Sequence, residues 1–330
     1  MPSEQALASL SNSLVYAALG IYVLAMLSYA AAAAVAPVRM QRRATAVALA
    51  TVIAGAPSSG PASLDEPTSS QRAGFGWRTG TSLTVLATAL HALGVLMRGL
   101  ASGRAPWGNM YEFALVGALV ASIAYLVLLR IQRRSAEDLR VALSLGVWVV
   151  GLVALTLGLA ITVLYVPAGP LIPVLNSYWL VIHVAAAITC AGVFTVGAVC
   201  HLLYLLQVRS GRRAESGTGR GRRTTLPSAE TLERIAYKVH VFAFPLWTFA
   251  VIAGAIWAEN AWGRYWGWDP KETWAFITWV MYAAYLHAAA TPSWRGARGA
   301  VLGLLGYAAL LFNFIGVNMW ISGLHSYAGV

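Results

Sequence analysis

The chain has 330 residues, of which 58% are hydrophobic and only 11% are charged, with a formal net charge of +11. Several charge-free apolar runs are long enough to cross about 30 Å of hydrocarbon. This composition excludes an ordinary water-soluble domain and predicts an all-α, polytopic integral membrane protein. We set nucleic-acid binding aside as a remote alternative, because the basic residues sort by loop along the chain.

Eight apolar segments predict about eight transmembrane helices joined by short outer loops. In chain order they are residues 12–36, 79–101, 110–130, 141–165, 178–207, 238–258, 270–290 and 299–320. A ninth segment, 44–56, has only 13 residues and predicts a re-entrant or interfacial stretch. The N-terminus lacks a charged region followed by a short apolar core and a cleavage site, so we expect the first span to be retained as an anchor that enters from outside.

The basic residues predict which side of the membrane each loop occupies. Of the 23 Lys and Arg, 19 lie in four segments, 37–78, 130–140, 208–238 and 291–298. The other four, Arg98, Arg104, Arg264 and Lys271, lie on the opposite side. By the positive-inside rule the first set is cytoplasmic, which predicts a multi-pass protein of the plasma membrane.

One basic loop and the two cysteines limit the functions that the chain can have. The segment 208–230 is rich in Gly, Ser and Arg and predicts a disordered or lipid-touching cytoplasmic loop. Cys190 and Cys200 lie ten residues apart on one predicted helix, about 15 Å of rise, which is beyond disulfide reach. Because no CxxC motif occurs, the chain is neither a thiol oxidoreductase of the usual type nor a carrier of covalently attached haem.

Residues 257–279, here called the Trp segment, hold six of the chain's 13 tryptophans. Indole rings stack on other π systems, so this density indicates a surface for a large planar ligand. The alternative is an aromatic belt at the membrane interface, which needs no ligand.

The Trp segment also contains a readable helix start. Asp269 fits the N-cap, Pro270 the first position and Glu272 the third, a variant of the capping box. We interpret Asp269 as chiefly architectural, with direct ligand contact as the alternative. The positive end of the helix dipole, with Lys271 and Arg264 nearby, favours carboxylates on a bound ligand.

Histidines within a membrane protein are candidate functional groups. His183 lies near the outer end of the fifth span and His325 follows the eighth, so both flank the Trp segment. Two imidazoles on opposite sides are what a low-spin haem iron requires, and this is our hypothesis for the pair. The alternative for each is a hydrogen-bonded packing role.

The other four histidines lie deeper along the predicted helices. His287 follows Pro270 by 17 residues, about 26 Å along the helix. With His91 it is a candidate for a deeper second site, although an isolated His91 can instead donate to a helix carbonyl. We expect structural roles for His201 and His240.

These residues carry a resemblance to a known family. Trp262, Gly263, Trp266, Trp268 and Asp269 resemble the WGxxWxWD signature of the haem-handling (WWD-motif) proteins of cytochrome c-type biogenesis. The continuation PKETWAFITW is similar to their CcsA/CcsB/ResC branch. Further similar patterns are APWGNMYEF at 105–113, SYWLVIHV at 177–184, YLH ending at His287 and GVNMWISGLHSYAG at 316–329. The resemblance covers most of residues 79–330, which it marks as one haem-handling membrane domain. Residues 1–78, a first helix plus a cytoplasmic segment, carry no match.

The resemblance implies a role in cytochrome c maturation of the system II type. Haem b would be the substrate, held at the outer face and attached to the CxxCH motif of apocytochrome c. His183 and His325 would coordinate the iron, and His287 would hold haem in transit together with a partner's histidine. The implied partner is a ResB-like membrane subunit with a large outer domain. Any enzyme activity would be a cytochrome c haem lyase activity of that complex, and no general acid or base is evident.

Two other function classes remain open. A di-haem membrane cytochrome in quinone-linked electron transfer would also pair histidines at two depths, but it does not require the Trp signature. A solute transporter with the Trp segment as its vestibule predicts inverted repeats. We detect no such repeats in the sequence.

Overall fold

The computed structural model describes residues 3–53, 69–132, 136–169, 177–215 and 226–325. All regular structure in these residues is helical. The helices are α1 (Glu4–Ile53), α2 (Ser69–Ser102), α3 (Met110–Gln132), α4 (Ala136–Val163), α5 (Tyr178–Glu215), α6 (Ala229–Trp262), α7 (Pro270–Ala290), the 3-10 turn η2 (Pro292–Trp294), α8 (Ala297–Leu311), the π-helix η3 (Phe312–Gly316) and α9 (Val317–Trp320).

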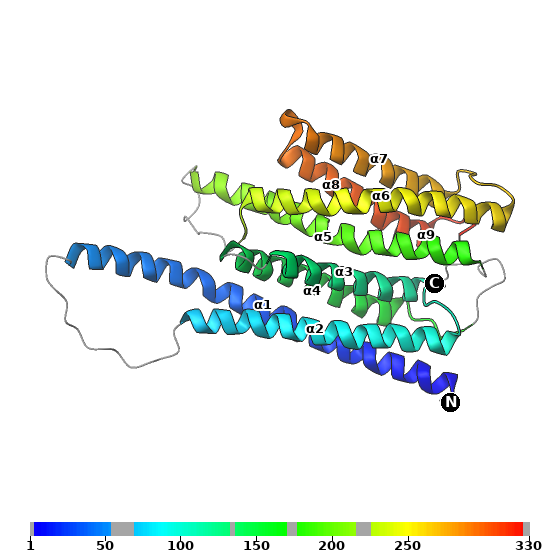
Figure 1. Cartoon of the computed structure of the whole chain (residues 1–330), viewed down its shortest axis with the longest axis horizontal. Coiled ribbons are helices and arrows are strands. Elements are labelled where there is room, and N and C mark those ends of the chain that lie inside the picture. Colours follow the sequence, from blue (N-terminus) through cyan, green and yellow to red (C-terminus); the bar gives the residue numbers. More distant parts are fainter. Residues whose placement is uncertain (1–2, 54–68, 133–135, 170–176, 216–225, 326–330) are drawn as a thin grey trace.

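The long helices run side by side in one bundle (Figure 1). The pair α1 and α2 lies along one side, and α7 with α8 lies along the opposite side. Between them, α3 packs on α4 and on α5, while α5 packs along α6 and α8. The N-terminus, the loop between α6 and α7, and the end of α9 all lie at one end of the bundle, which we call the Trp end.

Seven of the predicted crossings are long and apolar enough to span a membrane, so this is a multi-pass membrane protein. They correspond to α1 through α6 and to the continuous run Ala297–Trp320 formed by α8, η3 and α9. The predicted span 270–290 exists as α7 and has 21 residues, but it is not among those seven. Polar groups such as Lys271, Glu272 and His287 lower its mean hydropathy. It packs along α8 all the same.

Two predictions about the connecting segments were wrong. Residues 44–53 are not a separate re-entrant stretch, because their backbone continues α1 without a break; Ala44–Ile53 contains neither Gly nor Pro to end a helix. Residues 54–56 lie outside the described part. The loop 208–230 is also shorter than predicted, since α5 extends to Glu215 and α6 begins at Ala229. Its remaining residues 216–225 lie outside the described chain.

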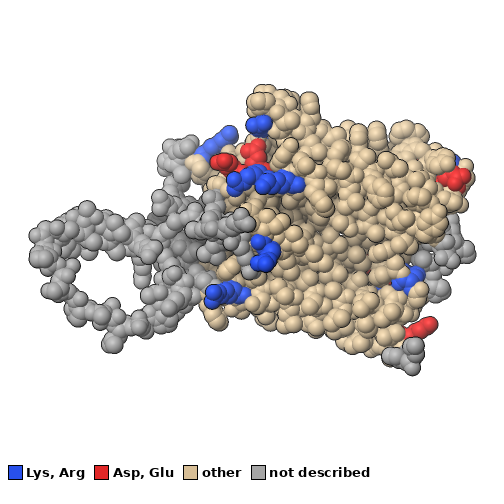
Figure 2. All heavy atoms as spheres, viewed as in Figure 1, with Lys and Arg blue, Asp and Glu red and all other residues tan. Residues whose placement is uncertain are grey.

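The charged side chains separate along the bundle as the loop pattern predicts. Figure 2 shows Lys and Arg gathered at the end opposite the Trp end. Described cations at that end, which we call the basic end, include Arg209, Arg212, Arg234 and Arg298. The middle of the visible face carries neither Lys, Arg, Asp nor Glu, as expected for a surface in contact with lipid.

At the Trp end, one buried group of charges ties the loops together. Glu112 in α3 is fully buried and accepts from Arg98 Nε (2.9 Å) and Arg104 Nη1 (2.7 Å). Arg98 also donates to the carbonyl of Val166, after α4. Removing one member of such a network leaves an uncompensated buried charge. It therefore fixes the loop that carries Trp107, which packs near Trp257 and Trp262.

Candidate functional site

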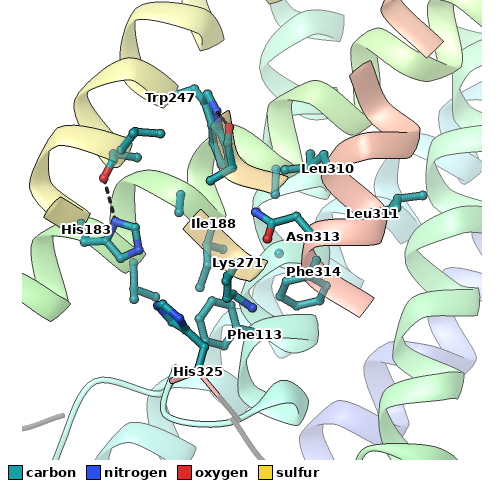
Figure 3. A pocket seen from close by; sticks show the side chains of 18 of the residues that line it. Phe113, His183, Ile188, Trp247, Lys271, Leu310, Leu311, Asn313, Phe314 and His325 are labelled. Carbon is teal, nitrogen blue, oxygen red and sulfur yellow. Dashed lines mark hydrogen bonds between the residues drawn. The ribbon is translucent and has the colours of Figure 1, made fainter. Parts of the chain in front are cut away.

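A cavity of about 250 Å³ lies among α3, α4, α5, α6, α7, α8 and η3, toward the Trp end. Most of its wall is apolar. Its aromatic, charged and imidazole members are Phe113, His183, Trp247, Trp257, Trp262, Tyr265, Trp266, Lys271, Glu272, Tyr307, Phe314 and His325. We call this space the Trp cavity (Figure 3). An apolar cavity with a few convergent polar groups is the usual form of a small-molecule site.

His183 reaches the Trp cavity from the first turns of α5. Its Nδ1 lies 2.7 Å from the carbonyl oxygen of Ala250 in α6, as the dashed line in Figure 3 shows. A carbonyl oxygen only accepts, so Nδ1 carries the proton and Nε2 carries the lone pair. Gly254 makes this approach possible, because a Cβ there would lie 2.7 Å from the His183 ring. His183 also stacks parallel to Trp257.

His325 reaches the same cavity from the segment after α9. Its Nδ1 lies 2.8 Å from Oδ2 of Asp269, and the other oxygen of that carboxylate accepts from the Leu324 N–H at 2.7 Å. The ring packs edge to face against Trp262 and Trp257. The sequence places His325 more than 50 residues from Asp269, so the folded chain creates this pair.

Burial favours the neutral imidazole of His325. Burial lowers the pKa of His325 below its ordinary value of 6.5, although the hydrogen bond to Asp269 opposes this. Partial burial would raise the pKa of Asp269, but the hydrogen bonds from His325 and Leu324 outweigh it and bring that pKa to about 2. Asp269 is therefore an ionised acceptor at neutral pH, Nδ1 of His325 donates to it, and Nε2 is the nitrogen that can ligate a metal.

The predicted capping box is confirmed. Asp269 accepts from the Lys271 N–H (3.2 Å), and Glu272 Oε2 accepts from the Asp269 N–H (3.0 Å) and the Gly267 N–H (2.8 Å). Glu272 thus folds the Trp segment back over the start of α7. Asp269 is architectural as predicted, but it has a second task that the sequence did not reveal, since it also orients His325.

The signature tryptophans divide into two groups. Trp262 and Trp266 line the Trp cavity, and Gly263 ends α6 with a left-handed φ of 69°. Trp268 lies outside the lining and is 64% exposed; it packs edge to face on Trp266 and adopts a φ of 57°. A non-Gly residue with positive φ stores strain of about 1–3 kcal/mol, and such residues cluster at functional sites.

The two cations predicted to attract carboxylates also separate. Lys271 lines the Trp cavity and donates to Oδ1 of Asn318 in α9 at 2.7 Å. Arg264 is not part of the lining; its guanidinium lies 3.5 Å from Glu272 at the rim. Of these two residues, only Lys271 therefore presents its amine to the interior.

His287 and His91 are not brought together. His287 lies in the last turn of α7, on an exposed face and away from the Trp cavity. His91 is buried in α2, edge to face with Tyr22 of α1, on the opposite side of the bundle. The interpretation of these two residues as one deeper site was wrong.

His201 in α5 and His240 in α6, the inner histidine pair, pack 5.0 Å apart between ring centroids, nearer the basic end. Both contact Tyr285 of α7. A Cβ at Gly303 would collide with His201, and a Cβ at Gly197 would collide with His240. Neither residue lines the Trp cavity, so the pair is packed as core.

Sequence reasoning missed three parts of the site. Trp257 is 2% exposed and contacts both His183 and His325. Gly254 makes room for His183. Asn313 lines the cavity from the π-helix η3. Trp257 stood at the start of the Trp segment and was available as a signal, whereas nothing local to Gly254 or Asn313 indicates their contacts.

Comparison with known proteins identifies the family. The family model described as cytochrome C assembly protein matches residues 107–325. The cytochrome c biogenesis protein CcsA of Porphyra purpurea is 32% identical over 277 residues, which cover 74% of this chain and 85% of that protein. CcsA of Guillardia theta is 41% identical over 172 residues, covering 48% of this chain and 57% of that protein.

A solved structure gives the same fold at lower sequence similarity. The cytochrome c haem lyase CcmF aligns with a TM-score of 0.59 and 17% identity over 95% of this chain. The chain spans 47% of the length of CcmF, so the likeness concerns the fold alone. The alternative of a di-haem electron-transfer cytochrome gains no support from these matches. The chain belongs to the cytochrome c assembly protein family and takes part in cytochrome c maturation.

Proposed function

We propose that this chain holds haem b in the Trp cavity, with iron between Nε2 of His183 and Nε2 of His325, and presents it for attachment to apocytochrome c. The observation that carries the proposal is that both imidazoles have Nδ1 directed at an acceptor and share one aromatic cavity. A histidine tied in this way has a fixed tautomer and a more basic second nitrogen, which is the usual preparation of a metal ligand.

The wall of the Trp cavity fits a porphyrin. Trp257, Trp262 and Trp266 supply indole faces and edges for a large π system, and two neutral imidazoles are the donor set of a six-coordinate, low-spin haem. The exposed Trp268 lies beside Trp266 at the rim, where a protein substrate approaches. Haem is here the cargo of the protein.

The chemical step requires orientation more than acid or base catalysis. Each cysteine thiol of a CxxCH segment adds its sulfur to one carbon of a vinyl group and its hydrogen to the other, with no net oxidation. The substrate's own histidine then replaces one axial imidazole, which releases the product. Holding vinyl and thiol in near-attack geometry replaces an unfavourable encounter and is the contribution of this chain.

The basic end faces the cytoplasm and the Trp end faces outside, by the positive-inside rule. The described loops are short, so the complex needs a ResB-like subunit with an outer domain for substrate binding. Haem lyase activity then belongs to the complex. We also propose that His287, which is exposed on α7, shares haem in transit with a partner histidine.

The test of the outer ligands uses His183→Gly and His325→Gly in the purified membrane complex. We expect loss of the low-spin haem spectrum in each, with recovery on adding free imidazole to fill the space left. Unchanged haem content and an unchanged spectrum would refute the ligand assignment. For His287→Gly we expect the outer ligands to work when haem is added directly but the yield of mature cytochrome c to fall; an unaltered yield counts against the transit role.

A further inference from the structure

Asn313 lines the Trp cavity with a buried amide oxygen that has no hydrogen-bond partner among the described residues. The residue is 7% exposed. A buried amide that is left unsatisfied costs about 1–3 kcal/mol. Figure 3 shows its side chain directed from α8 and η3 into the cavity. Rotation of the amide by 180° exchanges oxygen and NH2, so Asn313 can offer either to a ligand.

The backbone around Asn313 is unusual. Residues Phe312–Gly316 form a π-helix, and single π turns within α-helices occur frequently at functional sites. A Cβ at Gly316 would lie 2.7 Å from the Phe312 ring, so glycine permits this local packing. The π turn changes the direction in which Asn313 points relative to a continuous α-helix.

Lys271 lines the same cavity from the start of α7. Its ammonium group has three donors, of which one goes to Asn318 Oδ1. Asn318 is itself held by the Phe314 carbonyl at 2.8 Å. Among the described residues that line the cavity, Lys271 is the one Lys or Arg. The neighbouring Glu272 accepts two backbone N–H groups at Oε2, and its Oε1 lies 3.5 Å from the guanidinium of Arg264. This wall therefore suits a carboxylate.

Haem b has two propionates along one edge and its vinyl groups away from that edge. In the proposed reaction the vinyl groups must meet thiols at the mouth of the cavity. The propionate edge must then lie inside, where a carboxylate is stable only against a cation or hydrogen-bond donors. We propose, on the basis of the proposed function, that Lys271 and Asn313 form a propionate subsite that selects which edge of the haem faces the substrate.

A propionate subsite predicts that the protein binds haem b more tightly than an ester of haem that lacks the carboxylates, whereas a pocket that holds only the ring and the iron would bind both equally. Wild-type protein is titrated with haem b and with its dimethyl ester, which keeps the iron and vinyl groups but lacks both carboxylates. We expect the diester to bind about 10- to 100-fold more weakly, the equivalent of about one charge-assisted hydrogen bond. Lys271→Met and Asn313→Leu should each lower the affinity for haem b until it approaches the affinity for the diester. The affinity for the diester should stay within about twofold of wild type.

Matched controls are Lys238→Met and Asn260→Leu. Lys238 is exposed near the basic end of α6, and Asn260 is exposed and donates to the Ile256 carbonyl of its own helix. Neither lines the Trp cavity. We expect both controls to keep the full preference for haem b over the diester.

A second readout addresses orientation. In Lys271→Met and Asn313→Leu complexes loaded with saturating haem, we expect the yield of thioether-linked cytochrome per bound haem to fall severalfold. Equal affinity of wild type for haem b and diester, or equal loss of both ligands in the variants, would overturn the subsite while the bis-histidine spectrum stands. If wild type shows no low-spin spectrum dependent on His183 and His325, the proposed function fails and the subsite fails with it.

Discussion

The two histidine pairs of the bundle have the same composition and opposite surroundings. His183 and His325, at the Trp end, have Nδ1 directed at an acceptor and face a cavity. His240 Nδ1 likewise lies 2.7 Å from the Ala236 carbonyl oxygen, but His201 and His240 pack against Tyr285 and closely against Gly303 and Gly197, and neither lines the cavity. The difference is one of space: an acceptor at Nδ1 prepares an imidazole as a metal ligand, but a ligand can reach Nε2 only where the neighbouring helices leave a cavity.

The largest expected effect comes from replacing one histidine of each pair. His183→Gly should lower haem retention by more than the roughly 10–100-fold that loss of an outer hydrogen-bond partner costs. His240→Gln, in the inner pair, should reduce thermal stability and leave the haem spectrum of folded protein unchanged. Absorption spectra and melting of the same preparations test both. The assignment of haem to the outer pair would be contradicted if His183→Gly kept the wild-type haem spectrum, or if folded His240→Gln protein lost it.

The next effect concerns the acceptor that orients His325. Asp269→Asn keeps a good N-cap for α7 but removes the carboxylate that fixes the His325 tautomer. We expect haem affinity to fall by about 10–100-fold with little change in helix content. Titration with haem and circular dichroism measure the two quantities. Full affinity would mean that Asp269 acts only as a helix cap.

Glycine substitutions test whether space decides the role of each pair. Gly254→Ala places a methyl group 2.7 Å from His183, and a displacement of about 1 Å can cost on the order of 100-fold in a positioned function. Gly303→Ala presses on His201 instead and should cost about 1–3 kcal/mol of stability, with haem affinity retained. Gly158→Ala, where nothing lies within 4 Å, is the control. If Gly303→Ala lowers haem affinity as much as Gly254→Ala, space does not separate the pairs.

The smallest effect is the response to acid. The pKa of His325 lies below 6.5 and that of Asp269 is about 2. Less than half of His325 is therefore protonated at pH 6.5, and Asp269 stays ionised far below that pH. Haem affinity should change by less than about twofold from pH 8 to 6.5 and decline further at lower pH, as protons compete for His325. A midpoint of loss at or above pH 6.5, measured by spectral titration, would contradict this electrostatic account.

Much of the fold and part of the site follow from local sequence. Apolar length predicts the long helices, and the Asp269, Pro270 and Glu272 pattern predicts the start of α7 because capping depends on neighbouring residues. His183, His325, Trp262, Trp266 and Lys271 were selected from the sequence and line one cavity.

The remaining features depend on contacts between distant segments. Three features arise only when α5 through α9 pack together: the Asp269–His325 hydrogen bond, the space at Gly254, and the Asn313 amide oxygen that has no partner among the described residues. Local pattern also failed at segment ends, where α1 continues past the predicted first span and α5 extends into the predicted loop. No spacing rule distinguishes His91 from His183, because both are single histidines in apolar helices.

The most direct test of the central claim is a structure of the haem-loaded membrane complex at a resolution that shows axial ligands. We expect iron bonded to Nε2 of both His183 and His325, with their Nδ1 atoms still directed to the Ala250 carbonyl and to Asp269. Iron bonded to neither, or to one of them with the other turned out of the Trp cavity, would contradict the account.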